Sequence, residues 1–171
     1  MTAAGEHPSI GPTPVDAAFL SAHPAHMVAL VGGAGLAPFA PGTIGAAVGV
    51  PIGLILSDLP PLAATVLLVI AFIAGIWACG ATANHAGVHD HPAIVFDETW
   101  AMAAVIAFVP DGILPTLLGF VAFRAFDILK PWPIGFIDRR VDEGWGIMLD
   151  DAVAALFALG LVLSLARFGL F

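Results

Sequence analysis

Charged residues are scarce in this chain of 171 residues: they make up 11% of it, whereas hydrophobic residues make up 60%. An average soluble domain has about 25% charged residues. So little polar surface cannot cover a globule in water, and the composition therefore indicates an integral membrane protein. Basic residues are the scarcest, with five Lys and Arg against thirteen Asp and Glu. The resulting net charge of −8 excludes a general nucleic-acid-binding protein.

Cysteine is nearly absent as well, because Cys79 is the single one and lies inside an apolar run. An internal disulfide is thereby excluded. Residues 1–26 contain neither Lys nor Arg and no long apolar run, which argues against a cleaved signal peptide. We expect residues 1–26 to form a mobile N-terminal arm, in which His7, His23 and His26 are exposed to solvent and have no role. Residues 27–171 are predicted to form a single membrane-embedded domain.

Long apolar runs are what the chain has in abundance. Residues 62–83 contain no charge for 22 positions, about the length of a helix that crosses a ~30 Å hydrocarbon core. Three further hydrophobic segments cover 43–57, 99–126 and 152–166. The segment 43–57 contains the small residues Gly45, Ala46, Ala47 and Gly49, which favour close packing inside a bundle. The sequence therefore predicts an all-α, polytopic membrane helical bundle of about four hydrophobic segments.

The segment 99–126 is too long for one crossing and is interrupted at Pro110-Asp111-Gly112. Two interpretations fit it: one tilted, kinked helix that crosses fully, or a hairpin of two half-length helices that turns at Pro110–Gly112. The hairpin would bring Asp97 and Glu98 to the same side as the charges at the end of the segment. It is favoured because the alternative separates two charged clusters by a whole bilayer.

Four of the five basic residues lie between positions 124 and 140: Arg124, Lys130, Arg139 and Arg140. Basic residues beside membrane spans favour the cytoplasmic side, which alone would explain such a cluster. However, Arg124, Asp127 and Lys130 are spaced i, i+3, i+6 and share one helical face. A topology signal requires neither this spacing nor a carboxylate between the cations. We therefore assign Arg139 and Arg140 to topology, and Arg124 and Lys130 to binding of a phosphate group.

Paired carboxylates precede two hydrophobic segments: Asp97-Glu98 before 99–109, and Asp150-Asp151 before 152–166. Helix capping explains one residue of each pair but not both. Carboxylate oxygens suit Mg²⁺, and Arg and Lys suit phosphate oxygens. The combination predicts Mg²⁺-assisted phosphoryl chemistry. The candidate metal ligands are Asp97, Glu98, Asp150 and Asp151, and the alternative for one of them is to act as general base instead. Asp127 is either a further ligand or the residue that orients Arg124.

Weaker candidates surround this set. Thr43, in the turn APGT, is a plausible N-cap whose helix N-terminus would offer N–H groups to the substrate phosphate. Asp138 and Asp90 are possible helpers, while His89 and His91 are weak candidates for a transition-metal site. Three of the four tryptophans, Trp100, Trp132 and Trp145, are typical of membrane-interface anchors.

Three blocks of sequence carry a resemblance to a known family. They read GLAPFAPGTIG at 35–45, HDHPAIVFDE at 89–98 and FRAFDILKPWPIGFIDRRVDEGWGIMLDDAVAA at 123–155. These blocks are similar to the phosphatidylglycerophosphatase A family of bacterial membrane phosphatases. The sequence departs from the family pattern at Thr99-Trp100-Ala101, where an aliphatic residue followed by Gly is expected. The missing glycine is expected to affect helix packing more than the chemistry of the site.

The resemblance implies hydrolysis of phosphatidylglycerophosphate to phosphatidylglycerol and inorganic phosphate in phospholipid biosynthesis, with Mg²⁺ as cofactor. It also implies a multi-pass protein of the bacterial inner membrane whose active site faces the cytoplasm. The expected partners are the lipid substrate and membrane lipids, without nucleic acid. The alternative is a small membrane cation transporter or channel subunit that uses the paired carboxylates, which would place acidic residues in the middle of helices. The residues leave open the oligomeric state, and whether water attacks directly or an aspartyl phosphate forms.

Overall fold

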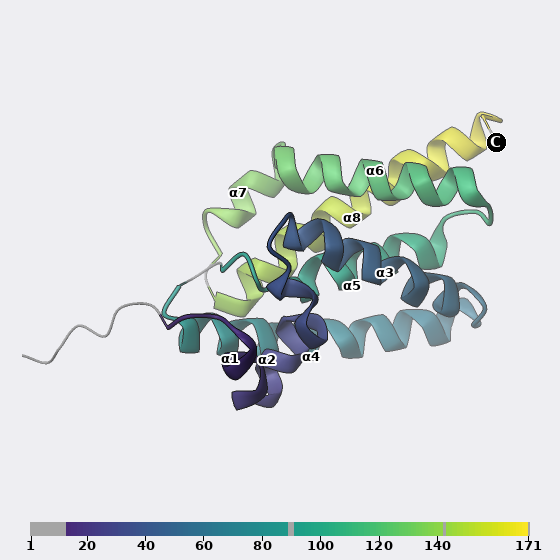
Figure 1. The fold of residues 1–171 in the computed structure, drawn as a ribbon. Helices are drawn as coiled ribbons and strands as arrows, with labels where there is room; N and C mark the ends of the chain where they lie inside the picture. The colour runs from purple at the N-terminus through teal and green to yellow at the C-terminus, as the bar shows by residue number, and fades with distance from the viewer. Residues whose placement is uncertain (1–12, 89–90, 142, 171) are drawn as a thin grey trace, which may run out of the picture.

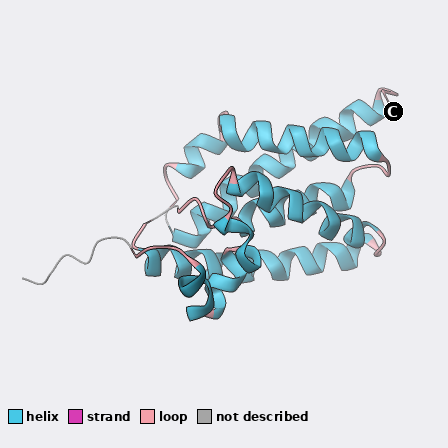
Figure 2. Ribbon diagram, in the orientation of Figure 1, coloured by secondary structure: helices cyan, strands magenta, loops and turns pink. Residues whose placement is uncertain are grey.

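A computed structural model of the chain describes residues 13–88, 91–141 and 143–170, and Figure 2 shows only helices and loops in these ranges. The all-α prediction is confirmed for this part of the chain. The elements are α1 (Ala17–Ala22), α2 (Pro24–Ala29), the 3₁₀ helix η1 (Val31–Leu36), α3 (Pro41–Ser57), α4 (Pro61–Ala86), α5 (Phe96–Phe108), α6 (Ile113–Leu129), α7 (Ile134–Asp138) and α8 (Glu143–Arg167).

The long helices α3, α4, α5, α6 and α8 run side by side, with the connections α3–α4 and α5–α6 at one end of the bundle (Figure 1). Helices α5 and α6 are antiparallel and in contact, and the chain reverses between Val109 and Gly112. The hairpin interpretation of 99–126 is therefore confirmed. Gly112 has φ 133°, a conformation that residues with a side chain rarely adopt, which explains a glycine at this reversal.

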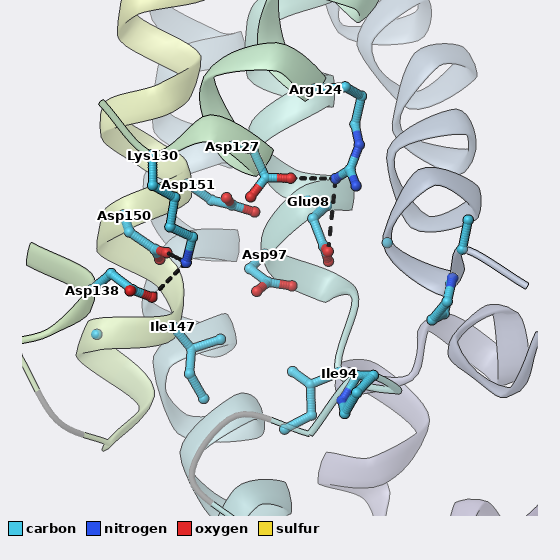
Figure 3. A pocket seen from close by; sticks show the side chains of 15 residues that line it. Ile94, Asp97, Glu98, Arg124, Asp127, Lys130, Asp138, Ile147, Asp150 and Asp151 are labelled. Carbon is cyan, nitrogen blue, oxygen red and sulfur yellow. Dashed lines mark hydrogen bonds and ion pairs between the residues drawn. The ribbon is translucent and has the colours of Figure 1, made fainter. Parts of the chain in front are cut away.

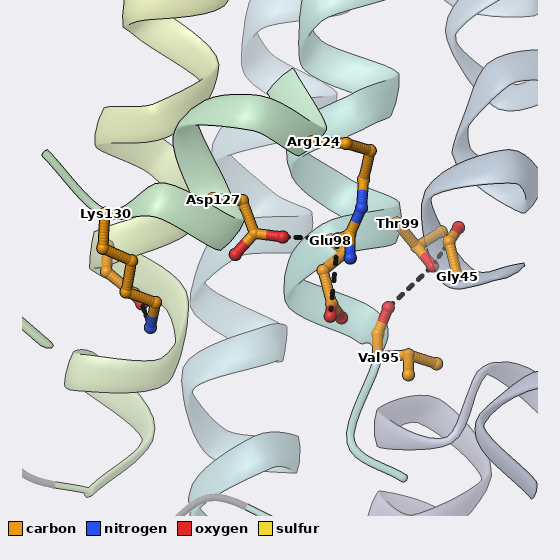
Figure 4. A network of polar contacts seen from close by, with 8 residues as sticks. Gly45, Val95, Glu98, Thr99, Arg124, Asp127 and Lys130 are labelled. Atoms are coloured by element: carbon orange, nitrogen blue, oxygen red, sulfur yellow. Dashed lines mark hydrogen bonds and ion pairs between the residues drawn. The ribbon is translucent and has the colours of Figure 1, made fainter. Parts of the chain in front are cut away.

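Helices α3 and α5 make the most extensive helix pair of the bundle, because glycines let their backbones approach closely. A Cβ atom added at Gly49 would lie 2.4 Å from the carbonyl oxygen of Thr99. The Thr99 hydroxyl lies 2.8 Å from the carbonyl oxygens of both Gly45 and Val95, toward which it donates (Figure 4). Thr99, which departs from the family pattern, thus supplies a contact between α5 and α3. Of the four small residues predicted to pack inside the bundle, Gly45, Ala46 and Gly49 are buried and Ala47 is exposed.

Helix α8 begins two turns earlier than the sequence predicts, at Glu143, so Asp150 and Asp151 lie inside the helix and not before it. The prediction that the two carboxylates precede the helix is therefore wrong. A Cβ atom at Gly144 would lie 1.9 Å from the carbonyl oxygen of Ile76 on α4. The glycine therefore permits the close packing of α8 against α4, and this packing compensates for the low helix propensity of glycine.

Helices α4 and α8 are long and apolar enough to cross a membrane, whereas α3 is a shorter apolar helix. Large apolar side chains on the outer surface of α4 are exposed, among them Ile70 and Ile73. Such a surface suits hydrocarbon and would be a liability in water. Length and composition thus identify two candidate spans, and crossing by four segments stays a prediction.

The N-terminal helices α1 and α2 lie beside α4, and α2 packs against it (Figure 1). The backbone N–H of Thr13 also donates to the carbonyl of Ala86 at the end of α4, with N and O 3.0 Å apart. His26 is 3% exposed. The expectation that His26 faces solvent is therefore wrong, because its ring packs between Phe19 of α1 and His85 of α4.

Candidate functional site

A pocket of about 380 Å³ lies at the end of the bundle opposite the α5–α6 turn (Figure 3). Its charged walls come from the first turn of α5, the C-terminal part of α6 with the following Lys130, the end of α7, and Asp150 and Asp151 of α8. The N-terminus of α3 closes another side. The charged residues that line it are Asp97, Glu98, Arg124, Asp127, Lys130, Asp138, Asp150 and Asp151. The three charged segments singled out in the sequence therefore meet in one place.

Three carboxylates form the centre of the pocket. Asp97 and Glu98 come from the first turn of α5, and Asp151 faces them from α8 (Figure 3). One oxygen atom of each lies within 4.8 Å of the other two. Asp97 and Asp151 are buried, and a carboxylate oxygen of all three side chains is buried without a hydrogen-bond partner.

Unpartnered buried carboxylate oxygens are costly, because desolvation is not repaid by a hydrogen bond. Mg²⁺ prefers octahedral oxygen coordination, usually by one or two carboxylates with water and phosphate oxygens as the other ligands, and this group of carboxylates offers such donors. Asp97, Glu98 and Asp151 therefore fit a Mg²⁺ ion. Asp150, the fourth predicted ligand, lies in the pocket but outside this group.

The electrostatic environment of α5, which lies outside the two candidate spans, agrees with a cation site. Burial and the neighbouring carboxylates of Glu98 and Asp151 raise the pKa of Asp97 well above its ordinary value. Burial also raises the pKa of Glu98. Negative charge is thus unfavourable here unless a cation compensates for it.

Arg124 lies beside this carboxylate group and forms ion pairs within the pocket. Its guanidinium donates to Asp127 one turn later on α6, and Nη1 lies 3.8 Å from Oε1 of Glu98 (Figure 4). Of the two roles predicted for Asp127, the geometry places it as the partner of Arg124. The buried Nε of Arg124 has no hydrogen-bond partner, so the guanidinium retains a donor for a ligand.

Lys130 occupies the opposite wall between two carboxylates. Its ammonium donates to Asp138 on α7 and to Asp150 on α8, and Nζ lies 2.6 Å from Oδ2 of Asp150 (Figure 3). Burial disfavours the charge on Lys130, but these two hydrogen bonds outweigh it and raise the pKa of the ammonium group. Helix α6 ends at Leu129, and Lys130 follows it with a left-handed φ of 41°. Lys130 therefore does not share a helical face with Arg124, although the spacing had predicted that it would.

The N-terminus of α3 reaches the pocket through Ala40, Pro41 and Gly42. The prediction that Thr43 is the N-cap is wrong, because the helix begins at Pro41 and Ala40 takes the cap position. Proline is well suited to the first helical position, since its missing N–H needs no partner there. Thr43 is also absent from the described residues that line the pocket.

Gly42 was missed by sequence reasoning, although its contacts are among the tightest in the pocket. A Cβ atom added there would lie 2.1 Å from Oε1 of Glu98 and 3.4 Å from Nη2 of Arg124. The glycine is therefore required for the position of the Glu98 carboxylate. Its place in APGT, directly before a helix, is the signal that would have indicated a close approach.

Other candidates lie elsewhere or beyond what can be described. Trp100 donates from Nε1 to the carbonyl oxygen of Leu68, 2.8 Å away, and packs on Phe72, so it is wedged between helices. Trp132 and Trp145 are exposed. His91 accepts from the backbone N–H of Ala93. The candidates His89 and Asp90, like His7 in the arm, lie outside the described residues.

The sequence of this chain matches a known protein family over most of its length. Residues 27–166 match the family model described as Phosphatidylglycerophosphatase A. The chain is 37% identical over 141 residues to "Phosphatidylglycerophosphatase A" of Escherichia coli (strain K12), covering 82% of each chain. It is 39% identical over 147 residues to the protein of the same name from Haemophilus influenzae, covering 84% of this chain and 89% of the relative. No solved structure was found to match.

Proposed function

This chain belongs to the phosphatidylglycerophosphatase A family, and on that premise we propose that it hydrolyses phosphatidylglycerophosphate with Mg²⁺ as cofactor. The products are phosphatidylglycerol and inorganic phosphate. The observation that supports the proposal is the meeting of Asp97, Glu98 and Asp151 with two basic side chains in one pocket. A metal-binding carboxylate group beside cations is the arrangement that phosphoryl transfer requires.

Asp97, Glu98 and Asp151 would hold the Mg²⁺ ion. When bound, it neutralises phosphate charge and lowers the pKa of a coordinated water. The chain's own groups bind and orient the substrate. Arg124, held by Asp127, offers guanidinium N–H groups to the phosphate oxygens, whose charge grows in the transition state.

Lys130 is the second cation for the phosphate. Asp138 and Asp150 restrict its ammonium group to one region of the pocket, so that little rotamer freedom remains to be lost on binding. The backbone N–H groups at the start of α3 contribute the positive end of a helix dipole on the facing wall.

Hydrolysis then proceeds by direct attack of water on phosphorus. The bond between phosphorus and the glycerol oxygen breaks, and the proton that the water loses passes through one of the central carboxylates to balance the leaving oxygen. Asp97, Glu98 and Asp151 are the carboxylates close enough together to take part in this proton transfer, since one oxygen of each lies within 4.8 Å of the other two.

The two apolar helices and the named relatives indicate a membrane protein. We further propose that it crosses the bacterial inner membrane several times and that the pocket faces the cytoplasm. Arg139 and Arg140 follow α7 at the pocket end of the bundle, and basic residues beside spans favour the cytoplasmic side. The lipid would then present its phosphate from the headgroup layer.

The alternative, a cation transporter or channel subunit, has less support. Asp150 and Asp151 do lie within a helix, as that alternative predicted. However, the pocket's carboxylates are accompanied by Arg124 and Lys130, which repel a passing cation. The family assignment is to phosphatases.

A phosphate-release assay tests the proposal. The full chain is purified in detergent and supplied with phosphatidylglycerophosphate, with Mg²⁺ or with an excess of chelator. Release of inorganic phosphate that requires Mg²⁺ is expected. A folded sample that releases none, or that is equally active with chelator, would refute the Mg²⁺-dependent mechanism.

A further inference from the structure

A second group of metal-binding side chains lies where the N-terminal helices meet α4. His23 precedes α2, His26 lies within it, and His85 belongs to the last turn of α4. One ring nitrogen of each lies within 4.8 Å of the other two, although His26 and His85 are 59 positions apart in sequence. The described lining of the acidic pocket includes none of the three.

His26 is fixed in position and in tautomer. Its ring stacks on Phe19 at a centroid distance of 3.9 Å, and Nδ1 lies 2.6 Å from the carbonyl oxygen of the same residue. A carbonyl oxygen only accepts, so Nδ1 carries the proton and Nε2 keeps a free lone pair. Metal-binding histidines are oriented in this way, with the second ring nitrogen donating to a carbonyl or carboxylate oxygen.

His85 supplies the second nitrogen. Its Nδ1 lies 2.9 Å from Nε2 of His26, toward which it donates. His85 is exposed, so its proton can pass to Nε2 through solvent, which frees Nδ1 as a ligand. Two nitrogens bound to one tetrahedral Zn²⁺ at 2.0–2.1 Å are about 3.3 Å apart. The two rings therefore need to separate by only about 0.4 Å to accept the ion.

His23 supplies the third nitrogen, at the expense of a helix cap. Its Nδ1 accepts from the backbone N–H of Ala25, 3.1 Å away. A neutral imidazole has one free ring lone pair, so binding a metal through either nitrogen replaces this hydrogen bond. The ring centroid of His23 lies 5.2 Å from that of His85, so the ligand can be reached without unfolding α2.

We propose that His23, His26 and His85 form a site for a borderline divalent cation of the Zn²⁺ class, which holds α2 against the end of α4. Neutral imidazole suits Zn²⁺, whereas the acidic pocket suits Mg²⁺. Among the described residues the group consists of these three histidines, and a tetrahedral site needs one further ligand besides them. The proposal does not depend on the phosphatase assignment.

Equilibrium dialysis tests the site directly. The full chain, purified with a tag that lacks histidine and stripped with chelator, is dialysed against micromolar Zn²⁺ in the presence of millimolar Mg²⁺. Metal per chain is then measured by mass spectrometry. We expect about one Zn²⁺ per chain, and a fall to less than about a tenth of that in His85→Gln. His85 is exposed, so this variant keeps the fold even where a change at buried His26 would not.

Two matched variants make the result decisive. His91→Gln removes a histidine outside the group and should retain Zn²⁺, and Asp97→Asn should also retain it. Zn²⁺ should raise the thermal midpoint of the wild-type chain but not that of His85→Gln. Absence of bound Zn²⁺, equal binding by His85→Gln, or loss in Asp97→Asn would each overturn the site.

Discussion

The acidic pocket and the histidine cluster are two polar groups within one apolar bundle, and they are built in opposite ways. The pocket gathers carboxylate oxygens from α5 and α8, deep between helices and beside Arg124 and Lys130. The cluster gathers imidazole nitrogens at the junction of α2 with the end of α4. The difference teaches that the type of donor atom, and not proximity alone, decides which cation each region suits.

The largest expected effect is at the centre of the pocket. Asp97→Asn should lower kcat/KM by more than about a hundredfold, because losing even an outer partner of a metal ligand costs about 10- to 100-fold. Phosphate release by the purified variant measures it, with circular dichroism as the check on folding. His85→Gln is the counterpart in the cluster and should leave turnover unchanged. Wild-type turnover by Asp97→Asn would show that Asp97 is not a metal ligand.

The next test concerns the position of Glu98. Gly42→Ala places a methyl group where Oε1 of Glu98 now lies, 2.1 Å from the added carbon, so the carboxylate must shift. A misplacement of this size should lower kcat by about 10- to 100-fold. Gly160→Ala in α8 is the matched control, because a Cβ atom there meets nothing within 4 Å. Equal activity of the two variants would show that Glu98 tolerates displacement.

Proton release distinguishes the two regions without mutation. The raised pKa values of Asp97 and Glu98 mean that these carboxyls hold protons to a higher pH than usual, and Mg²⁺ must displace them. Mg²⁺ affinity should therefore fall as pH falls. Titration calorimetry in two buffers of different ionisation enthalpy measures the protons released.

The cluster should behave differently near neutral pH. Burial lowers the pKa of His26, so its ring becomes neutral at a lower pH than that of an ordinary histidine, and Zn²⁺ has fewer protons to displace from it. Equal proton release for both cations would contradict the assignment of donor atoms.

The smallest effects are expected on the wall of Lys130. Asp138 is 35% exposed and Asp150 is 8% exposed, and both accept from the same ammonium group. Asp138→Asn should lower kcat/KM by less than about fivefold, because partly exposed ion pairs contribute about 1 kcal/mol or less. Asp150→Asn should cost more, since a buried partner is harder to replace by water. A phosphate-release assay measures both losses. A larger loss in Asp138→Asn than in Asp150→Asn would show that Asp138 is the more important partner of Lys130.

Much of the site followed from residue types and spacing. Hydrophobic runs predicted the helices, and the break at Pro110–Gly112 predicted the hairpin that brings Glu98 to Arg124. The boundaries were less predictable. The residues before Asp150 were predicted to lie outside the helix, and only the packing of Gly144 on α4 shows why the helix starts earlier.

The histidines mark the limit of reasoning from the sequence. His23 and His26 were expected to be exposed, since nothing in a polar arm without Lys or Arg indicates burial. Stacking on Phe19 and contact with His85, 59 positions away from His26, involve residues that no local pattern connects.

The sequence by itself determined the helical class, the apolar exterior and the acids and bases that carry charge, because composition and periodicity set them locally. Tertiary structure alone decided which of these charges meet. It placed Asp151 with Asp97 and Glu98 and gave Asp150 to Lys130, because neighbouring positions on a helix point about 100° apart. Tertiary structure also decided that position 42 must lack a side chain. The packing of α3 against α5 brings the Glu98 carboxylate so close to Gly42 that a Cβ atom would collide with it.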